Sequence, residues 1–257
     1  MHESPIFKFL GIEFDFSVLL ATIITIIIVF IIAKLSVRNL SVDKPTKMQN
    51  FMEWVIEFVS GFISSVMDMK RGKGFITLGV TLILFIFVAN LLGLPFNIST
   101  EVSQPFSLFG TEVISQQMID HAHETGKHLS IAWFKSPTAD ALFAMGLAGM
   151  VIFMVHFLGM TRNTKGYFKH YFEPFWFFIP LNLIKEFSKL LTLGMRLFGN
   201  IFAGEVMIAV ILMAGVGGIV PLIAWQGFSI FVGAIQAFIF TVLTMVYIAQ
   251  AAEKHHD

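Results

Sequence analysis

Long apolar runs broken by short polar segments dominate the chain from residue 16 onward. Residues 16–33 carry no charge, and 74–96 and 138–161 are two further apolar stretches of similar length. A helix needs about 20 mostly apolar residues to cross a hydrocarbon core of about 30 Å. The pattern therefore predicts membrane-spanning helices over 16–36, 74–96 and 138–161.

From Pro174 the chain stays apolar almost to its end, and the glycine-rich segment 215–221 is its one strong break. This break separates two arms, about 180–214 and 222–252. At 1.5 Å per residue the arms are about 52 Å and about 46 Å long, so both exceed a hydrocarbon core of about 30 Å. Such arms must bend or tilt by more than the usual angle of about 20°. We expect a long, strongly tilted helical hairpin over 174–252.

Segment 44–70 has apolar residues at helical spacing beside acidic ones. The apolar positions at this spacing are Phe51, Val55, Phe58 and Phe62. This pattern predicts an amphipathic helix at the membrane surface, with docking on a soluble partner as the alternative. The more polar segments 1–15 and 97–137 are read as an N-terminal segment and a loop on the outer side. The fold class is thus an all-α polytopic membrane protein, a single membrane domain with about five membrane-crossing helices.

The composition agrees with this fold class and excludes an ordinary soluble domain. Of the 257 residues, 56% are hydrophobic, and the mean hydropathy is +0.79. The 17 basic and 17 acidic residues balance, and no nucleic-acid partner is expected. The chain has no cysteine, which rules out disulfides and thiolate metal sites. Because the N-terminus lacks the basic flank of a cleaved signal, we expect the first apolar segment to be retained.

The placement of the basic residues predicts the orientation. Most follow spans one and three or the hairpin: Lys34, Arg38, Lys44, Lys47, Lys70, Arg71, Lys73, Arg162, Lys165, Lys169 and Lys254. The opposite side has only Lys8, Lys127 and Lys135. The positive-inside rule then predicts a multi-pass protein of the cell (plasma) membrane, with its N-terminus outside and its C-terminus in the cytoplasm. An odd number of crossings and no visible repeat argue against an inverted-repeat transporter.

Two charged residues, Arg196 and Glu205, lie in the apolar hairpin. A charge at the bilayer centre costs about 2.5–3.5 kcal/mol even on lenient insertion scales, so both residues need a functional explanation. Nine residues separate them, which is about 13 Å of rise and leaves them on opposite faces, so they cannot form a simple ion pair. Small residues flank Arg196 and would let another helix approach it. They are Gly194, Gly199, Ala203 and Gly204.

Each arm of the hairpin carries a stripe of polar residues. On the first arm it comprises Lys185, Lys189, Thr192, Arg196 and Asn200, and on the second arm Ser229, Gln236, Tyr247 and Gln250. Taken singly, these residues are explained by interhelical hydrogen bonds and by lysines that reach the interface. An arginine cannot relay protons, but a buried glutamate can. One fixed cation, with Glu205 and Glu186 displaced to either side, suits two offset proton paths and a passing carboxylate of another protein.

The run Leu193–Asn200, followed by Ala203, Gly204 and Glu205, resembles the signature of subunit a of the F-type ATP synthase, most of all in its bacillus-like members. Segments 236–247, 180–186 and 136–140 are similar to other parts of that family. The resemblance implies a stator subunit that conducts protons through two offset half-channels to a ring of c subunits. It also implies stator b subunits, the rest of the ATP synthase and the lipid bilayer as partners. No cofactor, metal or bond chemistry of its own is expected.

The resemblance assigns roles to named residues. Arg196 is the gate that faces the ring carboxylate, with Gln236 and Asn200 near it. The outer path comprises Glu205, Asn90, Asp140 and Ser229. The cytoplasmic path comprises Glu186, Tyr247, Gln250 and, as a weak candidate, His156, for which a packed neutral histidine is the preferred reading. The chain departs from some relatives at Ser229, where they carry a histidine, and at Gly93, where they carry an aspartate.

Two other functions fit parts of the sequence. A self-contained secondary transporter would use Arg196 to bind an anionic solute, but two overlong arms suit a curved partner surface better than a closed bundle. A structural anchor of a respiratory complex would leave Arg196 unexplained. The loop residues His121, His123 and His128 suggest a metal site, but with no carboxylate at convincing spacing a solvated loop is the preferred reading.

Overall fold

The computed structural model describes residues 2–3, 5–9, 12–93, 98–101, 104–108, 111–117, 119–120, 130–162, 164 and 175–252. Its α-helices are α1 (Phe16–Ser36), α2 (Lys47–Val66), α3 (Met69–Gly72), α4 (Ile76–Gly93), α6 (Ala141–Arg162), α8 (Ile179–Leu212) and α9 (Ile219–Ala252). Short 3-10 helices are η1 (Lys73–Phe75), η2 (Pro137–Ala139), η3 (Trp176–Phe178) and η4 (Gly215–Gly218). Within these ranges five helical segments are long and apolar enough to cross a membrane, which confirms the polytopic all-α fold.

Local signals in the sequence explain where the first helices begin. Asp15 caps α1, because its Oδ1 accepts the backbone N–H of Ser17 at 2.9 Å. Thr46 caps α2 in the same way, since its hydroxyl oxygen accepts the backbone N–H of Gln49 at 3.2 Å. The apolar runs that follow these caps then bury part of their surface against other helices and leave the rest for lipid.

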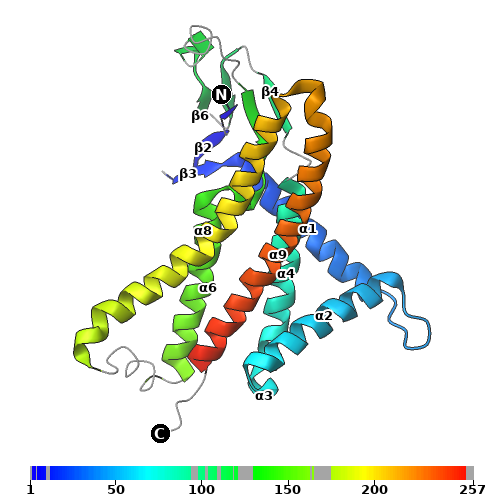
Figure 1. The fold of residues 1–257 in the computed structure, drawn as a ribbon, viewed down its shortest axis with the longest axis vertical. Coiled ribbons are helices and arrows are strands. Elements are labelled where there is room, and N and C mark those ends of the chain that lie inside the picture. The colour runs from blue at the N-terminus through cyan, green and yellow to red at the C-terminus, as the bar shows by residue number, and fades with distance from the viewer. Residues whose placement is uncertain are drawn as a thin grey trace.

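The two longest helices, α8 and α9, form the predicted hairpin. Each has 34 residues, a length of about 51 Å at 1.5 Å per residue. Figure 1 shows α8 running obliquely across α6. The turn between the arms depends on glycine, because Gly215 has a φ of 57°. A Cβ at Gly218 would lie 2.4 Å from the carbonyl oxygen of Ile211, so any side chain there would force the arms apart.

The hydrophobic core lies where α4, α6, α8 and α9 meet. Fully buried side chains from each of these helices share one cluster, among them Ile86, Ala148, Leu197 and Phe240. The hairpin is therefore fixed on one side by α4 and α6. Much of its opposite side remains exposed, including Leu183, Phe187, Met195, Phe202 and Val206 of α8.

The amphipathic helix α2 packs on α1, α4 and α9 of the same chain. Its buried stripe is Met52, Val55, Val59 and Ile63. Of the four apolar positions named from the sequence, Val55 is buried, Phe62 is half-buried, and Phe51 and Phe58 are exposed. Both faces of α2 are apolar enough to pack, and the smaller aliphatic side chains fit closer to the neighbouring helices. The aromatic side chains lie on the outside, where Trp54 stacks on Phe58 with ring centroids 5.8 Å apart.

Short strands, which the sequence reading did not predict, form in the N-terminal segment and the outer loop. They are β1 (His2–Glu3), β2 (Ile6–Phe9), β3 (Ile12–Asp15), β4 (Ile98–Glu101), β5 (Phe106–Leu108), β6 (Thr111–Ile114) and β7 (Ser130–Phe134). One sheet has the order β1-β7-β4, and β2-β3 and β5-β6 form two antiparallel pairs. Figure 1 shows the strands at the same end of the molecule as the hairpin turn, with α2 and α3 toward the other end. His121, His123 and His128 lie outside the described residues.

Candidate functional site

Arg196 lies near the middle of α8, on the border between the buried and the exposed face of that helix. Leu193 and Leu197 beside it are buried in the core, whereas Asn200, one turn further on, is exposed. Within the described part of the chain, the Arg196 guanidinium forms no ion pair and no hydrogen bond. A half-buried cation therefore stands on this helix without an opposite charge bound to it.

The small residues around Arg196 have two roles: one allows close helix packing, and the others leave the surface beside Arg196 open. Gly194 lets α6 approach, because a Cβ there would lie 3.1 Å from Met145 Cα and 2.4 Å from Met145 Sδ. Nothing lies within 4 Å of a Cβ built at Gly199, and Ala203 is exposed. Since Ala203 comes nearly two full turns after Arg196, it shares the face of that arginine. The side of α8 next to Arg196 is thus open to another molecule.

One hydrogen bond links the two polar stripes of the hairpin close to Arg196. The amide nitrogen Nδ2 of Asn200 donates to Oε1 of Gln236 over 2.8 Å. Gln236 is only 2% exposed, and its own Nε2 is buried and has no hydrogen-bond partner among the described residues. The structure therefore links Asn200, one turn after Arg196, to Gln236, and the NH2 group of Gln236 has no hydrogen-bond partner among the described residues.

Glu205 is half-buried on α8, at the level where α9 comes close. Its Oε1 is buried and has no hydrogen-bond partner within the described ranges. The Gly204 carbonyl oxygen next to it accepts the indole N–H of Trp225 at 3.3 Å. Ser229 is buried, and its Oγ lies 3.9 Å from a Cβ built at Gly204. Ser229 thus faces α8 at Gly204, the residue before Glu205.

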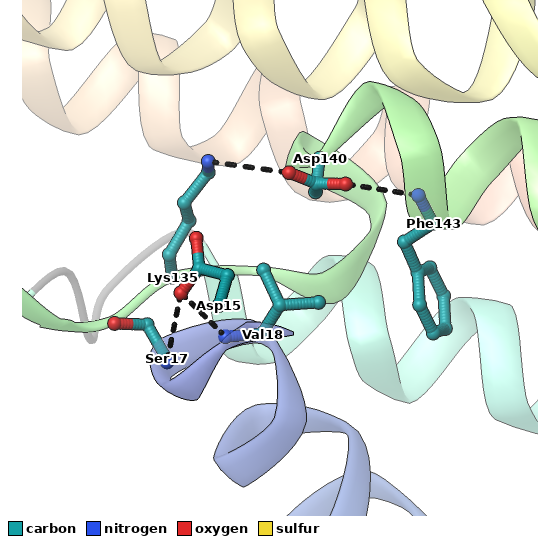
Figure 2. Close-up of polar contacts among 6 residues, drawn as sticks. All are labelled: Asp15, Ser17, Val18, Lys135, Asp140 and Phe143. Atoms are coloured by element: carbon teal, nitrogen blue, oxygen red, sulfur yellow. Dashed lines mark hydrogen bonds and ion pairs between the residues drawn. The ribbon is translucent and has the colours of Figure 1, made fainter. Parts of the chain in front are cut away.

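Asp140 lies just before α6, where it has two contacts. Its Oδ1 accepts the backbone N–H of Phe143 at 2.9 Å, which caps the first turn of α6. Its Oδ2 lies 3.9 Å from the Nζ of Lys135, and Figure 2 shows this lysine reaching over toward the aspartate. Asp140 is therefore held by a backbone amide and a cation.

Asn90 belongs to a buried polar cluster that joins α4, η2 and α9. Its Nδ2 donates to the Gly233 carbonyl oxygen at 3.1 Å, and its Oδ1 accepts the Thr138 hydroxyl at 2.8 Å. Ser136 lies 2.7 Å from Thr138, oxygen to oxygen, and donates to the Ala89 carbonyl oxygen at 3.0 Å. Because both functional ends of the Asn90 amide are engaged, its clearest structural role is to tie these elements together.

Packing explains the glycine at position 93. A Cβ built at Gly93 would lie 2.2 Å from Ser136 Cβ and 3.2 Å from Ser136 Cα. The buried segment that begins at Ser136 thus occupies the space that an aspartate side chain would need. The close contact between α4 and η2 therefore leaves room only for glycine at this position.

We predict that Gly93→Ala lowers the thermal stability of the solubilised protein by about 1–3 kcal/mol, the usual effect of overpacking. The measurement is the melting temperature of the purified complex. Gly146→Ala is the matched control, because nothing lies within 4 Å of a Cβ there. An unchanged melting temperature for Gly93→Ala would contradict the steric explanation.

A second polar group lies on the other side of Arg196, toward the start of α8. The Nζ of Lys189 lies 2.7 Å from the Oε1 of Glu186 and 5.2 Å from the centroid of the Tyr247 ring. The structure thus brings Glu186 and Tyr247 together, with Lys189 between them.

Gln250 and His156 are the remaining predicted site residues. Gln250 is exposed near the end of α9, and no hydrogen bond or ion pair is seen for it in the described part of the chain. His156 is half-buried on α6.

Three features of the site were missed by sequence reasoning. The pair between Glu186 and Lys189 has i,i+3 spacing, so that spacing was itself a readable signal. The partners of Asn90 had no such signal, because Thr138 comes 48 residues later in the chain. Lys135 was counted only as a basic residue of the outer side.

The geometry divides the hairpin into three levels. A cation without a bound opposite charge stands in the middle, beside a linked amide pair. A carboxyl group with a buried oxygen lies toward the hairpin turn, and a second carboxyl group beside a tyrosine lies toward the start of α8. Such an arrangement can hand protons to a carboxylate near Arg196 from either direction, while the cation opposes direct passage of a proton between the two sides.

Comparison with known proteins gives a consistent result over nearly the full length. The family described as ATP synthase A chain matches residues 18–249. The chain is 47% identical over 263 residues to ATP synthase subunit a of Anoxybacillus flavithermus, with 99% of each chain covered. It is 45% identical over 265 residues to ATP synthase subunit a of Priestia megaterium, and 44% identical over 271 residues to that of Bacillus pumilus. Both of these matches also cover 99% of each chain.

Proposed function

The chain belongs to the ATP synthase A chain family, and on that premise we propose that it is the proton-conducting stator subunit of the membrane sector. In this role it loads protons onto the carboxylates of a ring of c subunits from one half-channel and removes them through another. Each proton charge that crosses 100 mV releases about 2.3 kcal/mol. Ring rotation passes this energy to ATP synthesis elsewhere in the complex, and the subunit itself makes and breaks no covalent bond of a substrate.

The observation that carries this proposal is Arg196. It lies mid-helix in a hydrophobic hairpin, and no opposite charge is bound to it within the described residues. The open surface beside it, at Gly199 and Ala203, gives a ring carboxylate room to approach. A buried or half-buried cation is stabilised when a carboxylate reaches it, so each passing ring subunit supplies the missing charge in turn.

The outer path runs through Glu205, with Asp140 and Ser229 beside it and Asn90 further in. Glu205 is the proton carrier of this path, because it has a titratable group with a buried oxygen that binds nothing in the described chain. Ser229 faces α8 at the neighbouring Gly204 and offers a hydroxyl to this path. Asn90 cannot titrate, and we assign it a shaping role through its hydrogen bonds to Thr138 and Gly233.

The cytoplasmic path runs through Glu186 and Tyr247, with Gln250 near its mouth and His156 as a weak candidate. Lys189 holds the Glu186 carboxylate at 2.7 Å and lies over the ring of Tyr247. Gln236 and Asn200 stand near Arg196, and their hydrogen bond keeps the two arms in register there.

We propose that the protein lies in the cell membrane with its N-terminus outside and its C-terminus in the cytoplasm. This orientation puts the basic segment around α2 and α3 on the cytoplasmic side. The strands and the hairpin turn, which Figure 1 shows at one end, then face outward. Stator b subunits are the further partners that this position implies.

A secondary transporter with an arginine-lined anion site is the other candidate, and the family membership does not favour it. An anion site would also need donors that converge on Arg196 from several helices. In the described chain, the amide nitrogen of Asn200 instead donates to Gln236.

We predict that Glu205→Gln slows proton flux through the assembled complex by at least about tenfold, because an amide cannot carry a proton. The measurement is passive proton flow into vesicles under an imposed potential, normalised to the amount of assembled complex. Glu57→Gln, an exposed acid on α2, is the matched control and should conduct like the unmodified protein. Unchanged flux in Glu205→Gln would remove Glu205 from the path.

A further inference from the structure

We propose that the loop 37–46, which joins α1 to α2, binds the anionic lipids of the cytoplasmic leaflet. This inference rests on the proposed function, because the orientation proposed there puts the loop on the cytoplasmic side of the membrane. Figure 1 shows the loop at the edge of the molecule, beyond the end of α1 and the start of α2 and away from the hairpin.

The loop exposes apolar side chains to an unusual degree. Val37 is 59% exposed, Leu40 67% and Val42 99%. All three belong to one short connection between the membrane-spanning α1 and the amphipathic α2. Apolar surface left in water is unfavourable, so these side chains indicate contact with lipid or with another protein.

Basic side chains stand among these apolar ones. Arg38 and Lys44 of the loop and Lys47 at the start of α2 are exposed. In the described part of the chain, none of the three forms an ion pair. Asp43 is the single acid among them. The segment therefore has a net positive charge, and each basic residue close to an anionic leaflet strengthens binding about fivefold.

The loop has a fixed shape, because the side chain of Gln49 ties it to α2. The backbone N–H of Ser41 donates to Gln49 Oε1 at 3.1 Å, and Gln49 Nε2 donates to the Ser41 carbonyl oxygen at 3.0 Å. Gln49 is itself only 6% exposed. Leu40 and Val42, the two neighbours of Ser41, are thus exposed on an anchored backbone. A surface that is preorganised in this way loses little freedom when it binds.

Lipids fit this surface better than a protein does. A standard protein interface buries about 800 Å² per partner, and three apolar side chains in a short loop offer much less. Lipids meet the loop singly, and their phosphate groups supply the opposite charge that Arg38 and Lys44 lack. Anionic headgroups above acyl chains match this mixture of basic and apolar side chains. A stator subunit that covers the loop is the alternative outcome of the test.

The test uses Asn39→Cys, an exposed loop position, to attach a fluorescent label in the assembled complex. This chain has no other thiol, and the other subunits are chosen without reactive cysteines. The complex is placed in vesicles of phosphatidylcholine and phosphatidylglycerol, with a nitroxide quencher on the acyl chain of one lipid or the other. We expect quenching at least about threefold stronger from nitroxide-phosphatidylglycerol. A label at Val216→Cys, on the exposed hairpin turn, is the control and should show no such preference.

Two results of this measurement overturn the inference. Equal quenching of the Asn39→Cys label by both lipids would show that the loop meets the bilayer without selecting anionic lipid. A label that neither lipid quenches would show that the loop is covered by a protein or stands clear of the membrane.

Charge variants show whether the basic side chains cause the preference. The neutral triple variant Arg38→Gln, Lys44→Gln, Lys47→Gln should lose it. The matched triple variant Arg38→Lys, Lys44→Arg, Lys47→Arg keeps every charge and should retain it. A preference that survives neutralisation, or that both variants lose, contradicts the inference. ATP-driven pumping by Arg196→Ala is measured in the same lipids: normal pumping would refute the proposed function, whereas a missing lipid preference refutes the inference alone.

Discussion

Replacing Arg196 with alanine is expected to abolish ATP-driven proton pumping in vesicles that contain the assembled complex. The guanidinium is the only charge at the middle level of the hairpin, and no opposite charge is bound to it within the described residues. In the proposed mechanism, the cation favours the ionised form of a ring carboxylate that approaches it, and this effect is lost in the variant. The two proton paths are then no longer separated by a positive charge. Pumping should fall to the level of vesicles without the complex, as measured with a pH-sensitive dye.

The matched control is Lys185→Ala, which removes an exposed cation from the same helix. This variant should pump like the unmodified protein, because Lys185 lies three turns away from Arg196 and outside the contacts of the site. The amount of assembled complex and its ATP hydrolysis are measured for both variants. Normal coupled pumping by Arg196→Ala would contradict the role of Arg196 as the gate.

The sequence was sufficient to find the hairpin and the charges at its centre. An arginine and a glutamate in an apolar segment stand out because of their cost, and helical spacing already separates their faces. The polar stripes also indicated which helix faces meet, and the hydrogen bond between Asn200 and Gln236 joins a residue of each. These features follow from short-range periodicity, which a sequence displays directly.

The features that could not be predicted depend on contacts between distant segments. Asn90 reads as an isolated polar residue, whereas its partners Thr138 and Gly233 come from two other elements. The need for glycine at position 93 is explained only by Ser136, which packs against it. For α2, both sides of the helix are apolar, and tertiary packing selects the side of Met52 and Val59 rather than that of Phe51.

The short strands outside the helical bundle were missed for a related reason. Segments of two to five residues carry too little alternation to be recognised in a polar loop. β1 and β7 pair in parallel although more than 120 residues of sequence separate them. No pattern within a single segment predicts pairing over such a distance.

The two offset paths predict that water reaches different levels of the hairpin from different sides of the membrane. Ser229 faces α8 at Gly204, toward the hairpin turn, and the Tyr247 ring lies next to Lys189, the partner of Glu186, toward the start of α8. In a secondary transporter, by contrast, a single central site opens to both sides in alternation. Because the chain has no cysteine, single cysteines can be placed at these two positions without removing any native thiol from it.

The most direct test of the two-path arrangement is therefore the reaction of Ser229→Cys and Tyr247→Cys with a membrane-impermeant thiol reagent, added to sealed vesicles of each orientation. We predict that Ser229→Cys reacts only from outside and Tyr247→Cys only from the cytoplasmic side. Phe231→Cys, at an exposed apolar position of α9, is the control and should react from neither. Reaction of either path cysteine from both sides, or of neither cysteine at all, would contradict two separate half-channels that meet at Arg196.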